Sequence, residues 1–228
     1  MKRIFSIFIF FVCFALYMGA QTDKYHSQVL LETDSGNIII ELYNETPKHR
    51  DNFLLQVKRG TYNGVLFHRV IKDFMIQTGD IASKMAKKGQ LLGETPEEYN
   101  IPAEIKFPLL YHKRGAVAAA RESDDVNPNR SSSSTQFYIV WGKKYNDKQL
   151  DRYQAQIDKS TNGKIKLTND IRNVYSTLGG TPHLDGLYTV FGQVIEGLDV
   201  VEKIQNAICD SNDRPITDIK IKTARIIK

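Results

Sequence analysis

The sequence predicts a mainly β fold: a closed β-barrel capped by two helices, with a helical hairpin inserted late in the chain. Three observations support this prediction. Apolar runs rich in β-branched and aromatic residues recur between turn residues, which is typical of strands. Only two segments of the core sequence have apolar residues at helical spacing, too few for an alternating parallel sheet. A further segment, between Trp141 and Pro182, carries two helical patterns of its own.

The strands follow one another at short intervals. The run VLLETDSGNIIIELY contains two apolar stretches, and the turn residues Asp34 to Asn37 between them indicate a β-hairpin. The remaining strands are expected at 65–71, 74–78, 115–120, 136–140, 187–194 and 219–227. Together with the hairpin they make a set of eight.

Two segments are expected to form the helices that cap the barrel. In TPKHRDNFLLQVKRG, apolar residues from Phe53 onward recur at helical spacing. Thr46 is the expected N-cap, Pro47 takes the first helical position, and Gly60 ends the helix. The second, shorter helix is expected at 198–204.

The inserted segment, at about 143–181, is expected to form two amphipathic helices. Asn162-Gly163 divides the two helical patterns, and Gly179-Gly180 ends the second. The apolar positions are Leu150, Tyr153 and Ile157 in the first pattern and Ile171, Val174, Tyr175 and Leu178 in the second.

The first twenty residues resemble a signal peptide. Lys2 and Arg3 precede the apolar run IFSIFIFFVCFALYM, and the small residues Gly19 and Ala20 follow it. The run is short for a membrane span, although Met18 stands where a cleavage site has a small residue, so an uncleaved anchor is the alternative. We therefore expect a signal peptide at 1–20, an exported and periplasmic domain at 27–228, and no membrane association after cleavage.

Charge and cysteine content narrow the possible partners. The formal net charge of the chain is +5, and removal of Lys2 and Arg3 with the signal peptide leaves 29 − 26 = +3. That surplus is too small and too evenly spread to predict nucleic-acid binding. Cys209 is then the only cysteine, so no intrachain disulfide is possible. A monomer stabilised by its core is expected.

Alternation along the predicted strands brings several unusual side chains to one face. In a strand at 74–78, Met75 and Gln77 share a face, while Phe74, Ile76 and Thr78 share the other. In the neighbouring strands, the sets that share a face are Arg69 with Phe67 and Ile71, and Gln136 with Tyr138 and Val140. Each set alone is typical of an amphipathic strand with a solvated arginine. Together they place an arginine, two glutamines, a methionine and an aromatic residue opposite the core.

Five motifs carry a resemblance to a known family. In order and spacing, the segments FHRVIKDFMIQTGD, IPAEI, GAVAAAR, TQFYIV and LDGLYTVFGQVIEGLDVVEKI resemble the cyclophilin-type peptidyl-prolyl isomerases. The resemblance covers about 28–140 and 182–228 and leaves out the signal peptide and the insertion. It implies an eight-stranded antiparallel barrel capped by two helices, in agreement with the independent strand count.

The resemblance also implies a site. Rotation about an X-Pro bond needs no nucleophile, metal or cofactor; it needs a hydrogen-bond donor aimed at the prolyl nitrogen and an apolar socket for the ring. By resemblance, Arg69 is the donor and Gln77 orients it or a substrate carbonyl. The socket is formed by Phe74, Met75, Tyr138 and Leu184. The substrate-binding set is completed by Ala120 and Arg121, whose backbone pairs with the extended substrate, and by Gln136, His183 and Tyr188.

Four of these residues depart from the usual pattern of the family. Tyr138 stands at a position that is commonly Phe, and His183 stands where eukaryotic members usually have Trp. Tyr188 replaces a His and Arg121 replaces an Asn of eukaryotic members, as in bacterial sequences. None of these changes removes the donor, so proline-containing polypeptides remain the expected substrates and partners.

Other classes of site are not supported by the spacing of the residues. The five histidines include no H-x-x-x-H pair, the two cysteines make no zinc framework, and no G-x-S-x-G motif indicates a hydrolase. The remaining alternative is a non-catalytic peptide-binding or chaperone module of the same fold. The presence of Arg69 favours the enzyme, because a binding module has no need of the donor.

Overall fold

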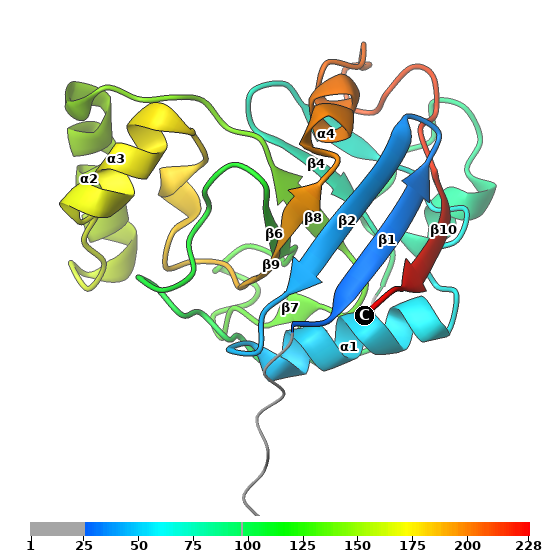
Figure 1. The fold of residues 1–228 in the computed structure, drawn as a ribbon, viewed down its shortest axis with the longest axis horizontal. Coiled ribbons are helices and arrows are strands. Elements are labelled where there is room, and N and C mark those ends of the chain that lie inside the picture. Colours follow the sequence, from blue (N-terminus) through cyan, green and yellow to red (C-terminus); the bar gives the residue numbers. More distant parts are fainter. Residues whose placement is uncertain (1–25, 97) are drawn as a thin grey trace, which may run out of the picture.

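The computed structural model describes residues 26–96 and 98–228, so the expected signal peptide lies outside the described residues. Figure 1 shows a sheet with helix α1 along one end, α4 near the other, and α2 and α3 to one side. Among the described residues, no helix combines the length and the apolar character needed to cross a bilayer.

The main element is an eight-stranded sheet whose pairings are all antiparallel. Its spatial order is β10-β1-β2-β9-β6-β8-β4-β3. The strands are β1 (Gln28–Thr33), β2 (Gly36–Leu42), β3 (Arg69–Ile71), β4 (Met75–Thr78), β6 (Ala116–Ala119), β8 (Phe137–Val140), β9 (Val190–Glu196) and β10 (Ile221–Ile226). A separate two-stranded sheet pairs β5 (Asn100–Ile101) with β7 (Ser132–Ser133).

The predicted closure of the barrel is not found. The sheet is an open half-barrel that ends at β3 and β10, although the eight strands and their antiparallel pairing agree with the prediction. Short contacts link the two edges: Phe67 donates its backbone N–H to the carbonyl of Ile219 at 2.8 Å, and Leu66 forms an isolated bridge with Lys220. The chain therefore turns between Phe67 and Arg69 and does not continue as one strand from 65 to 71.

The two expected capping helices are α1 (Pro47–Lys58) and α4 (Leu198–Gln205). Thr46 is the N-cap of α1, but its side chain makes no capping hydrogen bond. Glu104 takes over this role, because its carboxylate accepts the backbone N–H groups of Lys48 and His49 at 3.2 and 3.0 Å. Both helices pack on the main core, which lies against one face of the sheet.

The opposite face of the sheet carries a second apolar cluster. Its buried members come from four strands and include Met75 and Tyr138, whereas the partly buried members around them come mostly from loops. The latter include Phe74, Leu184 and Tyr188. The residues that the sequence assigns to a socket are therefore packed on one another, away from the main core.

The insertion contains α2 (Asp147–Thr161) and α3 (Asn169–Thr177), as expected. Asn146 and Gln149 form a capping box at the start of α2. The apolar stripes meet in a third cluster that contains Leu150, Ile157, Ile171 and Tyr175, each at most 5% exposed. Leu178, by contrast, is 38% exposed, because α3 ends before it.

The insertion leaves the sheet and returns to it at one closely packed point. A Cβ atom on Gly142 would lie 2.0 Å from the carbonyl oxygen of Gly180, so a side chain at this position would clash with the backbone. Gly180 also forms isolated bridges with Lys113 and Lys143. The base of the two helices is thus fixed to the sheet near β6.

Candidate active site

Strand register brings the predicted polar residues side by side. Arg69 lies opposite Gln77 across β3 and β4, and Gln77 lies opposite Tyr138 across β4 and β8. Tyr138 in turn lies opposite Ala118 of β6. Residues directly opposite one another project to the same face of a sheet, so Arg69, Gln77 and Tyr138 share one face, as strand alternation predicts.

Two phenylalanines lie elsewhere than simple alternation predicts. Phe67 belongs to the main core and is 1% exposed, because it precedes the turn into β3 and does not share a face with Arg69. Phe74 precedes β4 and packs with the cluster that contains Met75, not with the core that contains Ile76. The position of Phe74 agrees with the residue set implied by resemblance and contradicts the strand alternation.

A chain of side-chain hydrogen bonds crosses this face. Arg69 donates from Nη1 to Oε1 of Gln77 at 3.4 Å, and Gln77 donates from Nε2 to Oε1 of Gln136 at 3.2 Å. Gln136 donates from its own Nε2 to the carbonyl of Gly93 at 3.1 Å. Nε of Arg69 lies 3.7 Å from a carboxylate oxygen of Asp213. The Arg69 side chain is 45% exposed, and its guanidinium is held from two sides, with further N–H groups left for a ligand.

A cavity of about 170 Å³ opens beside Arg69. Nine residues line it, and all of them belong to the predicted site: Arg69, Phe74, Met75, Gln77, Ala120, Arg121, Tyr138, Leu184 and Tyr188. Phe74, Met75 and Leu184 give it apolar surface, and its charged groups are two guanidiniums. A larger cavity of about 510 Å³ shares Gln77, Ala120 and Arg121 with it, so the two form neighbouring hollows along one groove.

The hydroxyl of Tyr138 is engaged by a buried histidine. It lies 3.0 Å from Nε2 of His112, whose Nδ1 lies 2.9 Å from Oδ1 of Asp185. Burial raises the pKa of Tyr138 well above its ordinary value, and the nearby charge of Asp185 acts in the same direction. Tyr138 therefore keeps its proton, and its ring presents an apolar surface to the cavity although the residue is a tyrosine.

His183 does not line the cavity. Its ring stacks on Phe74 at a centroid distance of 5.4 Å and on Tyr153 of α2 at 5.7 Å, with interplanar angles of 27° and 26°. Burial lowers the pKa of His183 to about 4, so the ring is neutral at physiological pH. His183 thus supports a wall of the cavity from behind, instead of contributing the surface that the prediction assigned to it.

The backbone N–H and carbonyl of Ala120, which the prediction assigns to pairing with substrate, already form hydrogen bonds within the protein. Its N–H donates to the carbonyl of Gln136 at 3.0 Å, and its carbonyl accepts the N–H of Ser133 at 2.8 Å. The side chain of Arg121 is 3% exposed and is fixed by the carbonyl of Leu187 at 3.0 Å. Its guanidinium lies over the ring of Tyr188, 4.4 Å from the centroid. The guanidinium is also paired with Asp124 at 2.6 Å, so at this edge both the backbone of Ala120 and the charge of Arg121 are already engaged within the protein.

Comparison with known proteins identifies the family. The model of the cyclophilin type peptidyl-prolyl cis-trans isomerase/CLD family matches residues 28–226. A peptidyl-prolyl cis-trans isomerase-like 2 protein of Rhizopus delemar is 35% identical over 200 residues, which are 87% of this chain and 28% of that longer protein. A relative from Staphylococcus saprophyticus, also named as a peptidyl-prolyl cis-trans isomerase, is 32% identical over 88% of this chain and 92% of its own length.

Solved structures agree with the sequence comparisons. A crystal structure of a cyclophilin type peptidyl-prolyl cis-trans isomerase from Cryptosporidium parvum superposes with a TM-score of 0.62 at 26% identity, over 90% of this chain and 99% of that one. A second crystal structure of that protein, in the presence of the dipeptide Ala-Pro, superposes with a TM-score of 0.61. The chain therefore belongs to the cyclophilin-type peptidyl-prolyl cis-trans isomerases, enzymes that accelerate rotation about X-Pro bonds.

The sequence reasoning missed several residues that contact the site. Asp213 approaches Arg69, His112 and Asp185 hold Tyr138, and Tyr153 covers His183. Asp185 is adjacent to Leu184 in one of the motifs that carry the resemblance, and this position is its signal in the sequence. The others are joined to the site by chain folding over tens of residues, and no local pattern marks them.

Proposed function

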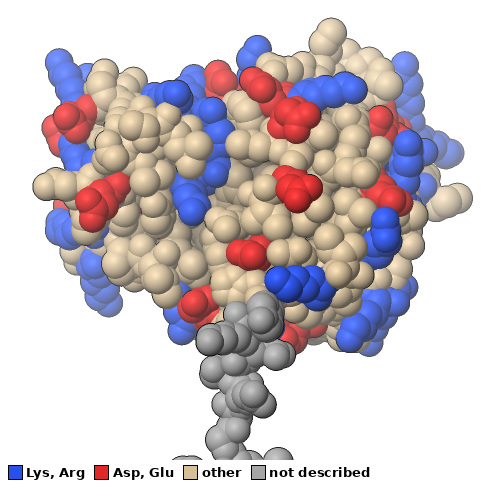
Figure 2. All heavy atoms as spheres, in the orientation of Figure 1, with Lys and Arg blue, Asp and Glu red and all other residues tan. Residues whose placement is uncertain are grey.

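We propose that this chain catalyses cis–trans rotation about X-Pro bonds of extended polypeptides, with the prolyl ring in the 170 Å³ cavity and Arg69 above it. The observation that carries the proposal is that the half-exposed side chain of Arg69 and the apolar side chains of Phe74 and Met75 line the same cavity. A module that only bound peptides would need the cavity and not the donor. The face in Figure 2 shows positive and negative side chains interspersed, which suits a polypeptide better than a nucleic acid.

Arg69 supplies the catalytic interaction in this proposal. Amide resonance opposes rotation with a barrier of about 18–20 kcal/mol, and the nitrogen lone pair becomes an acceptor only when the bond is twisted. A guanidinium N–H aimed at that nitrogen therefore stabilises the transition state more than either ground state. Gln77 and Asp213 hold the guanidinium from two sides, which limits the reorganisation needed during rotation.

In this proposal the cavity holds the prolyl ring, which stays in place while the X-Pro bond rotates. Phe74, Met75, Tyr138 and Leu184 present apolar surface to the pyrrolidine ring, while the residue before proline rotates in the open groove. Ala-Pro was included with the Cryptosporidium parvum protein, and we propose proline-containing segments as the ligands of this chain as well. Gln136, with its amide fixed by Gly93, is placed to contact the substrate backbone beyond Gln77.

Turnover of a proline-containing peptide, measured together with peptide affinity and melting temperature, tests this proposal. Arg69→Ala should lower the rate by roughly 10- to 200-fold, because a charge-assisted hydrogen bond contributes about 1.5–3 kcal/mol. Stability should change little, since the side chain is exposed. Arg225→Ala is the matched control: Arg225 is 61% exposed on β10, pairs with Glu32 and lines neither of the two cavities, and its loss should leave turnover unchanged.

Two other outcomes would contradict the proposed mechanism or the proposed activity. Near-normal turnover in Arg69→Ala would remove Arg69 from the mechanism. A wild-type protein that binds proline peptides without accelerating their isomerisation would be a peptide-binding or chaperone module. Arg69→Lys should also be slow, because an ammonium cannot contact Gln77 and the substrate with one planar group.

We further propose that the domain acts as a monomer on exported proteins after removal of 1–20. The sequence pattern of that segment supports export. Mass spectrometry of the protein recovered from the producing cell tests the point. A mature chain that begins close to Gln21 is expected, and a membrane-bound chain that keeps the segment would show the uncleaved anchor.

A further inference from the structure

A buried chain of polar groups joins the inserted helices to the floor of the cavity. Tyr175 of α3 donates its hydroxyl proton to Oδ2 of Asp185 at 2.7 Å. Oδ1 of the same carboxylate accepts both the backbone N–H and Nδ1 of His112, each at 2.9 Å. Nε2 of His112 then lies 3.0 Å from the hydroxyl of Tyr138. All four side chains are at most 5% exposed, so water does not compete for these bonds.

The chemistry of the groups fixes the direction of every bond in this chain. An ionised carboxylate only accepts, so Tyr175 and Nδ1 of His112 must both be donors to Asp185. In the tautomer with the proton on Nδ1, Nε2 is an acceptor and the Tyr138 hydroxyl donates to it. Burial raises the pKa of both Tyr138 and Tyr175 well above the ordinary value, so both protons are present. One defined arrangement results, in which the Tyr138 hydroxyl is turned away from the cavity.

A second contact from the insertion reaches the opposite wall of the cavity. Tyr153 of α2 stacks on His183, which stacks on Phe74. Phe74 lies just before β4 in a turn, since it is preceded by Asp73 with φ of +60°. Its backbone is held by Trp141 and Gly142, whose N–H groups donate to its carbonyl at 2.9 and 3.0 Å. The ring is then oriented by what it packs on, and the stacked pair lies behind it.

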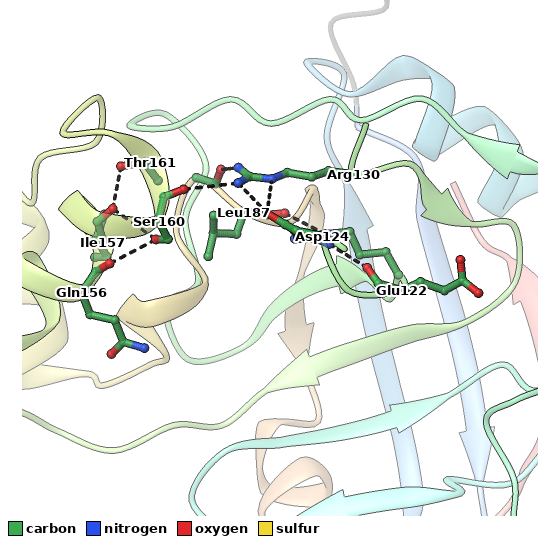
Figure 3. Close-up of polar contacts among 10 residues, drawn as sticks. Glu122, Asp124, Arg130, Gln156, Ile157, Ser160, Thr161 and Leu187 are labelled. Atoms are coloured by element: carbon green, nitrogen blue, oxygen red, sulfur yellow. Dashed lines mark hydrogen bonds and ion pairs between the residues drawn. The ribbon is translucent and has the colours of Figure 1, made fainter. Parts of the chain in front are cut away.

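A third contact fixes the end of α2 to the rim. Figure 3 shows Arg130, which donates to the carbonyl of Ser160 in the last turn of α2 at 3.3 Å and to that of Gly186 at 3.1 Å. The same guanidinium binds Asp124 at 2.8 Å. A Cβ atom on Gly186 would lie 2.5 Å from Ile165 in the loop after α2, so the two surfaces are in close contact.

We propose that the two inserted helices position the proline socket, and that Tyr175 is a positioning residue that acts through Asp185 and His112 on Tyr138. The inference rests on the proposed function, because it describes how the socket of that isomerase is held in its working shape. The tyrosine at the floor is compatible with an apolar socket only while its hydroxyl has a partner on the far side. The insertion completes the buried network that provides this partner.

The decisive measurement is the effect of Tyr175→Phe on kcat and KM for a proline-containing peptide, in the wild-type and in a Tyr138→Phe background. Loosening His112 should let the Tyr138 hydroxyl turn toward the cavity, and misplacement of about 1 Å in an active site can cost 100-fold. We expect kcat to fall by about tenfold or more, with a smaller change in KM. In the Tyr138→Phe background there is no hydroxyl to misplace, so Tyr175→Phe should have no further effect on kcat.

Tyr145→Phe is the matched control. It removes another buried tyrosine hydroxyl from the same apolar cluster, one that donates to the carbonyl of Gly180 at 3.2 Å. The backbone bond from Tyr145 to the carbonyl of Tyr175 and the ring contact with Tyr153 are kept in this variant, so only the hydroxyl is tested. It should lower the melting temperature without changing kcat. An equal loss of kcat in Tyr145→Phe and Tyr175→Phe would reduce the role of Tyr175 to general stability and overturn the proposal, as would equal effects of Tyr175→Phe in both backgrounds.

A second measurement applies if Tyr175→Phe does not fold. Tyr138→Phe alters only the socket end of the network. Because His112 loses its partner, amide hydrogen exchange in α3 around Tyr175 should become faster. Unchanged exchange there would contradict the coupling between Tyr138 and Tyr175. The proposed function fails separately, if wild-type protein shows no turnover or if Arg69→Ala keeps it. An active wild type, an inactive Arg69→Ala and an unimpaired Tyr175→Phe would reject the positioning role alone.

Discussion

Two buried histidines, His49 and His112, make the same kind of contact in different parts of the molecule. Nδ1 of His49 lies 2.8 Å from Oε2 of Glu104, and its Nε2 lies 2.9 Å from the hydroxyl of Ser132. The carboxylate of Glu104 also accepts the first N–H groups of α1. This group of residues therefore ties a helix end to β7. Ser132 is 1% exposed and lines neither of the two cavities beside Arg69, so this network ends on a buried hydroxyl.

The network of His112 has the same order of carboxylate, imidazole and hydroxyl, but it ends on Tyr138 in the wall of a cavity. Its carboxylate is bound by a helix of the insertion and not by a cap of the core. Because the two networks share the same chemistry, a hydrogen-bonded triad does not by itself indicate a function. What the terminal hydroxyl faces decides whether the triad stabilises the fold or shapes a site.

Asp185→Asn should produce the largest effect of the variants that separate the two networks. Asp185 accepts three hydrogen bonds while 0% exposed, and an amide in its place would point N–H groups at donors. We expect a stability loss of more than about 3 kcal/mol and a lower kcat, measured by urea unfolding and by turnover. Asp199→Asn, on the exposed face of α4, is the control. If folded Asp185→Asn protein kept the wild-type kcat, the His112 network would only stabilise the fold, as the His49 network does.

A third buried histidine, His68, is expected to make the free energy of unfolding depend on pH. It is 3% exposed, and neither ring nitrogen makes a hydrogen bond among the described residues. Burial lowers its pKa to about 4, below the value of about 6.5 for an unfolded chain. Above a pH of about 6.5, His68 binds a proton in neither the folded nor the unfolded state, so the free energy of unfolding does not depend on it. As the pH falls from 6.5 toward 4, the unfolded state binds the proton first and the free energy of unfolding decreases.

The expected loss from His68 is about 3 kcal/mol at pH 4. His49 and His183, whose pKa values burial also lowers, act in the same direction. Urea unfolding at pH 7 and at pH 4.5 measures the slope, and His68→Leu should make it shallower. The same slope in the variant and the wild type would show that His68 is not the group responsible.

Glu104→Gln should have a smaller effect than Asp185→Asn, although it makes the same chemical change in the other network. The side chain of Glu104 is 10% exposed and its role resembles that of a helix cap. Loss of a cap costs about 0.5–2 kcal/mol, and kcat should stay at the wild-type value because no cavity residue is attached. Thermal melts and turnover check both parts. A marked fall in kcat would mean that the His49 network reaches the site by a route that the contacts do not reveal.

Much of the fold follows from local patterns, and the site follows from the motifs. The strand at 136–140, for example, is predicted within one residue, because apolar alternation depends only on neighbours. The face of Phe74 is predicted wrongly by alternation, since the strand begins one residue later, at Met75. The contact between His112 and Asp185 spans 73 residues. Such a contact depends on how distant segments of the chain pack together, which no spacing rule describes.

Arg130→Lys should have the smallest effect, because it changes the exposed link between the insertion and the rim. The Asp124 partner is 51% exposed, so water and salt weaken the ion pair, and exposed pairs contribute at most about 1 kcal/mol. A lysine retains the charge but loses the fork that now reaches Ser160, Gly186 and Asp124 together.

We therefore expect a small fall in melting temperature that shrinks at high salt, and a kcat that changes far less than in Tyr175→Phe. Melts at low and high ionic strength, with turnover at both, provide the measurement. If Arg130→Lys slowed turnover as much as Tyr175→Phe, the insertion would act on the socket through the rim, and the buried network of His112 would stabilise the fold in the same way as that of His49.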